Sequence, residues 1–79
     1  PQVLENVRVT DKKAAQADFA VQAAVKAVAD ALGDSGRILV RESGTEPLVR
    51  VMVEAPEEAA CRKYVTQVVD TIRKGGYCV

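Results

Sequence analysis

The sequence has no histidine and no tryptophan, and its 79 residues include only three aromatic ones, Phe19, Tyr64 and Tyr77. Without histidine, neither a zinc site nor a histidine general base is expected. Sheets that bind RNA usually display aromatic residues on their strands, and here only Tyr77 lies near a possible strand. These absences argue against a zinc protein, a small histidine-dependent hydrolase and an RNA-binding sheet.

The sequence also lacks an excess of charge of either sign. Eleven lysines and arginines balance eleven acidic residues, so no overall basic field attracts nucleic acid or an anionic membrane. No apolar run approaches the roughly 18 residues that span a bilayer, and no charged-then-apolar leader is present. We therefore expect a soluble protein with neither nucleic acid nor membrane as partner, in which any anion site is local.

Cysteine is scarce as well. Cys61 lies within a helical pattern and Cys78 lies near the C-terminus, and the two lack the spacing of metal ligands. We expect free thiols, which suit a cytoplasmic location, and no metal site in this chain.

The length fits one domain, residues 1–79, with a small core, because so short a chain buries only about 60% of its unfolded surface. The chain opens at Pro1 without an initiator methionine and continues directly into a strand-like run, residues 3–9. We therefore expect a piece of a longer polypeptide whose other domains support this one.

The apolar pattern predicts the elements in turn. Alternating valines predict a strand over residues 3–9, and Thr10 and Asp11 are N-cap candidates for one alanine-rich helix that ends at Gly33. Residues 34–36 predict a turn, after which the continuously apolar residues 38–40 predict a short central strand that ends near Arg41. The apolar positions of the helix are Val21, Val25, Val28 and Leu32.

Residues 48–54 alternate again and predict a strand that forms a hairpin with residues 38–40. Pro56 suits the first position of a second helix, which ends before Gly75. Residues 77–79 predict a last short strand or a frayed end, and residues 75–79 as a whole are a candidate disordered tail. The order β-α-β-β-α predicts an α+β layer, an antiparallel sheet with two helices on one face. The apolar face of the second helix comprises Cys61, Val65, Val68 and Ile72.

The connection between the hairpin strands, residues 41–47, is long and rich in hydrogen-bonding groups, and loops of this kind often carry function. Gly44 permits a positive φ and lets a ligand approach the backbone, while Ser43 and Thr45 add hydroxyl donors. Arg41 and Arg50 flank the loop, so both guanidinium groups can reach one phosphate. The pattern is typical of an anion-binding loop.

Residue chemistry alone leaves a second interpretation open. Ser-Gly-Thr is common in turns, and Arg41, Glu42, Glu46 and Arg50 could form a solvated cluster of ion pairs. Lys12 and Lys13 are interpreted as solvated helix surface.

At this loop, Arg41, Ser43, Gly44, Thr45 and Pro47 match the pattern R-x-S-[GN]-T-x-P. The chain thereby resembles the C-terminal, fourth domain of the α-D-phosphohexomutases, which carries that pattern in its phosphate-binding loop. Residues 36–54 are most similar to the bacterial members that act on glucosamine phosphates. The resemblance spans nearly the whole chain and leaves only residues 75–79 without a counterpart.

The resemblance implies a TATA-box-binding-protein-like fold and a role in gripping the non-reacting phosphate of the substrate. The residues implied to bind that phosphate are Arg41, Ser43, Gly44, Thr45 and Arg50, with Glu46 and Pro47 supporting the loop. The parent enzyme is implied to interconvert glucosamine 6-phosphate and glucosamine 1-phosphate on the route to the cell wall.

In the family, that reaction passes through a phosphoserine and a bisphosphate intermediate. Mg²⁺ lies beside the phosphoserine, and both are held outside this domain. The implied partners are the phosphosugar and the three other domains, and the chain alone is expected to be inactive. The same domain of a phosphomannomutase or phosphoglucomutase is one alternative, because those enzymes share Ser-Gly-Thr-Glu-Pro. A non-catalytic α+β interaction module is another.

Overall fold

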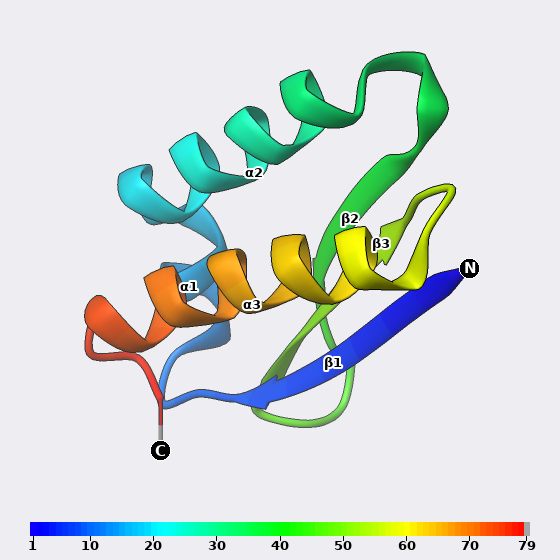
Figure 1. The fold of residues 1–79 in the computed structure, drawn as a ribbon. Helices are drawn as coiled ribbons and strands as arrows, with labels where there is room; N and C mark the ends of the chain where they lie inside the picture. Colours follow the sequence, from blue (N-terminus) through cyan, green and yellow to red (C-terminus); the bar gives the residue numbers. More distant parts are fainter. Residues whose placement is uncertain (79) are drawn as a thin grey trace.

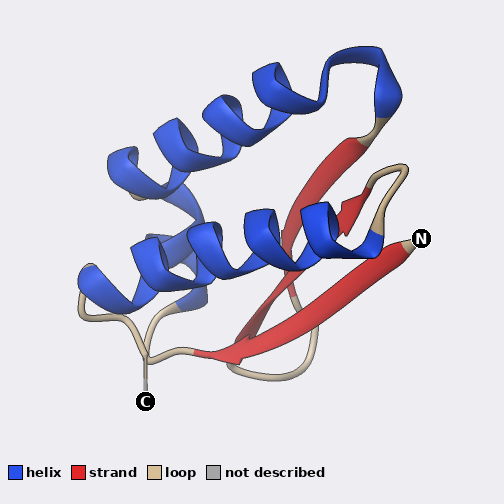
Figure 2. Ribbon diagram, viewed as in Figure 1, coloured by secondary structure: helices blue, strands red, loops and turns tan. Residues whose placement is uncertain are grey.

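The computed structural model describes residues 1–78. A three-stranded antiparallel sheet forms one layer and the helices form a second layer across one of its faces (Figures 1 and 2). The predicted α+β class is confirmed. The elements in chain order are β1 (Gln2–Arg8), α1 (Lys12–Ala17), α2 (Phe19–Leu32), the 3₁₀ turn η1 (Gly33–Ser35), β2 (Arg37–Glu42), β3 (Leu48–Glu54) and α3 (Glu58–Lys74).

The sheet has the order β1-β3-β2, so β3 is its central strand and β2 lies at an edge. The prediction that residues 38–40 form a central strand is therefore wrong. Ile38 and Val40 face the helices and are half-buried, whereas Leu39 lies on the opposite face beside Met52. The apolar run reflects partial cover on both faces and not a neighbouring strand on each side.

The helix predicted to end at Gly33 does end there, but it is divided in two at Asp18. The backbone of Asp18 leaves the helical region, with φ −57° and ψ 131°, and its carboxylate accepts hydrogen bonds from the backbone N–H groups of Ala20 (2.8 Å) and Val21 (3.1 Å). Asp18 thus serves as the N-cap of α2, as Asp11, which was predicted, does for α1. Residues 1–78 form three α-helices where two were predicted.

The core lies between the helices and the covered face of the sheet. Val49, Val51 and Val53 of β3 are 0% exposed on that face. Burying each valine side chain contributes about 1.5–3 kcal/mol, so β3 is central to the stability of this small domain. The predicted apolar face of α3 is buried too, together with Val69.

The last helix begins two residues later than predicted. Glu57 is its N-cap and α3 starts at Glu58, so Pro56 lies in the preceding turn and not at the first helical position.

The C-terminal segment is held against the start of the helical layer. Cys78 forms an isolated bridge with Val9, the Thr10 N–H donates to the Tyr77 carbonyl (2.7 Å), and the Tyr77 hydroxyl donates to Asp18 (2.6 Å). This hydrogen bond lowers the pKa of the Asp18 carboxyl, with help from the Val21 N–H, and raises the pKa of Tyr77. The segment pairs by one bridge where a last short strand or a frayed end was predicted, and Val79 lies outside the described residues.

Candidate anion-binding site

The register of the sheet places two arginines side by side. Arg41 of β2 lies directly opposite Arg50 of β3, and Asn6 of β1 lies opposite Arg50 on the other side. All three are exposed, on the face that the helices leave uncovered. Like charges directly opposite one another destabilise a sheet, so this pair costs stability unless an anion neutralises it.

No acidic side chain neutralises the arginine pair within residues 1–78. Glu42 instead pairs with Lys13, at 3.3 Å, and Glu46 forms no ion pair in that part of the chain. The alternative interpretation, in which Arg41, Glu42, Glu46 and Arg50 form a cluster of ion pairs, is therefore wrong. The two guanidinium groups remain available to an external anion.

A shallow hollow of about 380 Å³ lies on the open face beside the arginines. Its volume falls within the range of about 300–1,000 Å³ that is usual for small-ligand pockets. The two arginines lie at one end of the hollow, and the apolar side chains of Leu4, Leu39 and Met52 line the part next to them. The lining residues are Gln2, Leu4, Leu39, Arg41, Arg50 and Met52.

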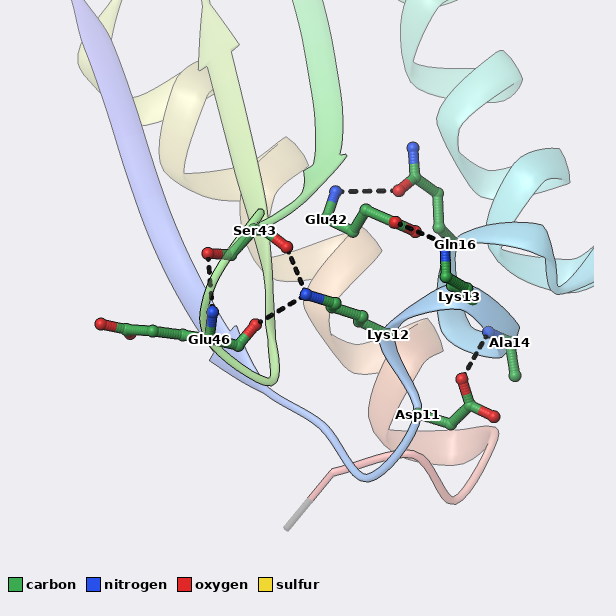
Figure 3. Close-up of polar contacts among 8 residues, drawn as sticks. All are labelled: Asp11, Lys12, Lys13, Ala14, Gln16, Glu42, Ser43 and Glu46. Atoms are coloured by element: carbon green, nitrogen blue, oxygen red, sulfur yellow. Dashed lines mark hydrogen bonds and ion pairs between the residues drawn. The ribbon is translucent and has the colours of Figure 1, made fainter.

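Ser43 organises the loop from within. Its backbone N–H donates to the Leu48 carbonyl (2.9 Å), and its hydroxyl oxygen accepts from the backbone N–H groups of Thr45 (3.3 Å) and Glu46 (3.2 Å). The side chain is only 8% exposed. The loop therefore uses three of its own amide donors internally, and Figure 3 shows the Ser43 hydroxyl directed at the Glu46 N–H.

Gly44 supplies the amide that the loop does not use. Within residues 1–78 its N–H has no hydrogen-bond acceptor, and a Cβ at this position would meet no heavy atom within 4 Å. Its φ is not positive, so the loop does not use the left-handed conformation that a glycine would permit here. Gly44 instead leaves open space at the surface of the loop together with one unpaired donor.

Lys12 contacts the loop, although no sequence pattern predicted this contact. Its half-buried ammonium group donates to the carbonyl oxygens of Ser43 and Glu46, the latter at 3.3 Å (Figure 3). The interpretation of Lys12 as solvated helix surface is wrong. The interpretation is correct for the exposed Lys13, which makes only a surface ion pair.

Gln16, on the same short helix, binds the adjacent end of β2. Its side-chain amide donates to the Val40 carbonyl (3.0 Å) and accepts from the Glu42 N–H (2.8 Å). Sequence reasoning missed this residue as well, because the contact joins positions more than 20 residues apart. Helix α1 thus holds both the strand that leads into the loop and the loop itself.

Two loop residues lie apart from the arginine hollow. The exposed Thr45 lines a second hollow, together with Lys12 and Pro47, so its side chain does not share the hollow of Arg41 and Arg50. The Pro47 carbonyl accepts from the Val9 N–H (2.9 Å) and ties the loop to the chain that follows β1. The structure brings the two arginines together but divides the hydroxyl groups of the loop between its interior and its other side.

Residues 1–78 contain neither a cluster of metal-ligating side chains nor a helix suited to crossing a membrane. That part of the chain holds no group of three or more Cys, Asp or Glu side chains placed to bind a metal ion. None of its helices combines the length and apolar character that crossing a membrane requires.

Comparison with known proteins places this geometry in a family. Residues 4–71 match the model of the phosphoglucomutase/phosphomannomutase C-terminal domain. The chain belongs to the phosphoglucomutase/phosphomannomutase family. The predicted resemblance to the α-D-phosphohexomutases is thereby confirmed, and the loop and arginine pair lie within the matched region.

Among the relatives of this family, the chain is 67% identical to a phosphoglucosamine mutase of Lachnospira eligens over all 79 residues, and 58% identical to that of Mycobacterium marinum over 96% of its length. It spans only 18% and 17% of those two proteins. It corresponds to less than a fifth of the relatives that it matches.

Solved structures agree with the family fold. The N-acetylphosphoglucosamine mutase of Aspergillus fumigatus, in complex with glucose 1,6-bisphosphate, superposes with a TM-score of 0.80 at 26% identity, over 96% of this chain and 16% of that one. The same enzyme in complex with GlcNAc-6P and magnesium gives a TM-score of 0.78 at 27% identity, with the same coverage of both chains.

Proposed function

We propose that this chain is the domain of a phosphoglucosamine mutase that binds the non-reacting phosphate of the substrate. The observation that carries the proposal is the register of β2 with β3, which sets Arg41 opposite Arg50 with no acidic partner among residues 1–78. A pair that costs stability in the free domain is understandable if a dianion occupies the space between the guanidinium groups. The names of the relatives support glucosamine phosphate as the substrate, and membership of the family supports a phosphate as the bound group.

In this proposal the chain binds and orients, and the rest of the parent enzyme carries the chemistry. Arg41 and Arg50 hold the phosphate with forked, charge-assisted hydrogen bonds, and the unpaired N–H of Gly44 adds a third direction of donation. Ser43, Thr45, Glu46 and Pro47 keep the loop in shape. Binding energy at the remote phosphate then places the reacting end of the sugar, which is how such contacts raise a rate.

The parent enzyme is proposed to interconvert glucosamine 6-phosphate and glucosamine 1-phosphate through a phosphoserine and a bisphosphate intermediate, in the cytoplasm. Mg²⁺ would neutralise phosphate charge at the phosphoserine. The described residues of this chain offer no cluster of acidic ligands for the ion, so no step of binding here runs through it. The sugar specificity likewise belongs to the other domains.

The test is a titration of the ¹⁵N-labelled chain with inorganic phosphate at constant ionic strength, followed by amide NMR. Signals of Ser43, Gly44 and Thr45 and the side-chain Nε–H of Arg41 and Arg50 should move saturably in the millimolar range, because one dianion lacks the sugar contacts of the whole enzyme. Sodium chloride at the same ionic strength is the control. Shifts confined to the helices, or none at millimolar phosphate, would refute the site.

The family model also covers phosphoglucomutases and phosphomannomutases, so the same domain of such an enzyme is the alternative. Turnover of glucosamine, glucose and mannose phosphates by the whole parent enzyme separates the two.

A further inference from the structure

We propose that Lys12 is a positioning residue that aims the Gly44 N–H of the loop at the bound phosphate. This inference rests on the proposed function of the loop and adds a residue outside the loop pattern. The observation that carries it is the pair of hydrogen bonds from the Lys12 ammonium to the carbonyl oxygens of Ser43 and Glu46.

Because the peptide unit is planar, the contact of Lys12 with the Ser43 carbonyl also determines where the Gly44 N–H points. The Ser43 carbonyl and the Gly44 N–H belong to the same peptide unit, and in a trans peptide the two groups point to opposite sides. No peptide bond among the described residues is cis. Because Lys12 draws the Ser43 carbonyl toward α1, the Gly44 N–H must point away from α1.

The side opposite α1 carries the unneutralised arginine pair, to which an anion would bind. Arg41 precedes Gly44 by three residues, a distance of at most about 10 Å along an extended chain, and both arginines lie on the sheet face that the helices leave open. On this inference the Gly44 N–H points to the same side of the sheet as the two guanidinium groups.

The charge of Lys12 adds to this effect. A cation that binds the carbonyl end of a peptide group polarises the group and strengthens its N–H as a donor, because linked hydrogen bonds reinforce one another. Lys12 also holds the Glu46 carbonyl, so it fixes both ends of the turn that Ser43 closes from within. Lys12 thus acts through the loop and need not touch the phosphate.

Lys13 provides a matched control beside Lys12. It carries the same charge, its side chain is 82% exposed, and within residues 1–78 it pairs with Glu42 alone. Replacing either lysine by methionine keeps the length of the side chain and removes one positive charge, so any general effect of charge on phosphate binding is shared by both variants.

The experiment compares Lys12→Met, Lys12→Arg, Lys13→Met and the unaltered chain by phosphate titration, with amide NMR at constant ionic strength. Lys12→Met should weaken phosphate binding about fivefold to tenfold beyond Lys13→Met, and should shift the Gly44 amide signal before any phosphate is added. Lys12→Arg should restore part of the affinity. Chemical denaturation of each variant, monitored by circular dichroism, separates a change in the loop from a loss of fold.

The outcomes distinguish the two proposals. If the unaltered chain binds phosphate at the loop and Lys12→Met binds it as well as Lys13→Met does, the positioning role is overturned while the proposed function stands. If the unaltered chain does not bind phosphate at the loop, the proposed function fails, and the inference fails with it.

Discussion

The two faces of strand β3 differ in what they contribute, although they alternate within seven consecutive residues. The covered face presents Val49, Val51 and Val53, all fully buried, whereas the open face presents Arg50 beside Arg41. The first face stabilises the domain, whereas on the second face the arginine pair costs stability by charge repulsion, beside the buried side chains of Leu48 and Met52. One strand therefore separates stability from binding by the direction of each side chain, and each can be altered alone.

The largest expected effect is on the covered face. Val51→Asp buries a carboxylate without a partner, a cost that exceeds the stability of a domain of this size. The variant should show no cooperative unfolding transition and a collapsed amide spectrum. Leu4→Asp, at a 55% exposed position on the open face, should keep the fold and lose no more than about 1 kcal/mol. A folded Val51→Asp chain would contradict this division of the strand.

The next effect is on the open face. Arg41→Ala should weaken phosphate binding about tenfold to a hundredfold, because a charge-assisted pair contributes roughly 1.5–3 kcal/mol, and Arg41→Lys should recover only part of this. In the parent enzyme proposed above, kcat/KM should fall by a similar factor, and more of the proposed bisphosphate intermediate should escape.

The same substitution should leave the free energy of unfolding unchanged or raise it by up to about 0.5 kcal/mol, because it relieves the repulsion. Arg37→Ala is the matched control, since Arg37 lies on the same face of the same strand but pairs with Glu54 at 3.5 Å. Equal phosphate affinity of the Arg41 and Arg37 variants would show that Arg41 is an ordinary surface charge.

The smallest expected effect is a pH dependence on the helical side. The lowered pKa of Asp18 contributes stability that is present above its ordinary value of 3.8 and is lost as the pH falls through the folded value. The raised pKa of Tyr77 contributes stability that is present below about pH 10 and is lost as the pH rises through the folded value.

Tyr77→Phe should therefore destabilise the chain most near neutral pH and progressively less toward both limits. Urea unfolding between pH 2.5 and pH 11 measures this, with Tyr64→Phe as the control. Phosphate binding at pH 7 should not change, which would separate this contact from the anion site. A pH-independent difference between Tyr77→Phe and the unaltered chain would show that the hydrogen bond does not govern the two pKa values.

Patterns in the local sequence predicted those features of the fold that depend on the burial of neighbouring residues. The strand over residues 48–54 and the apolar face of α3 were predicted correctly, because alternation and helical spacing record burial directly. The break at Asp18 was missed because the alanine-rich pattern continues across it, and the edge position of β2 was missed because an apolar run does not reveal how many strands flank it.

For the site, the loop and its flanking arginines could be found from spacing along the chain. Arg41 and Arg50 lie directly opposite one another because of the register between β2 and β3. The six residues of β2 are too short and too mixed in polarity to determine that register from sequence. The contact of Lys12 with Ser43 joins residues 31 positions apart and depends on where α1 packs. Nothing in the neighbouring sequence distinguishes Lys12 from Lys13.

The side chain of Gln16 has a consequence for how the molecule meets others of its kind. Edge strands expose unpaired backbone groups that can template the addition of a foreign strand and so start aggregation. The Gln16 amide offers one donor and one acceptor, as a peptide group does, and it occupies the outward carbonyl of Val40 and the outward N–H of Glu42. A single side chain thus takes the place of a neighbouring strand at the end of β2, and closes that part of the edge to pairing with a second molecule.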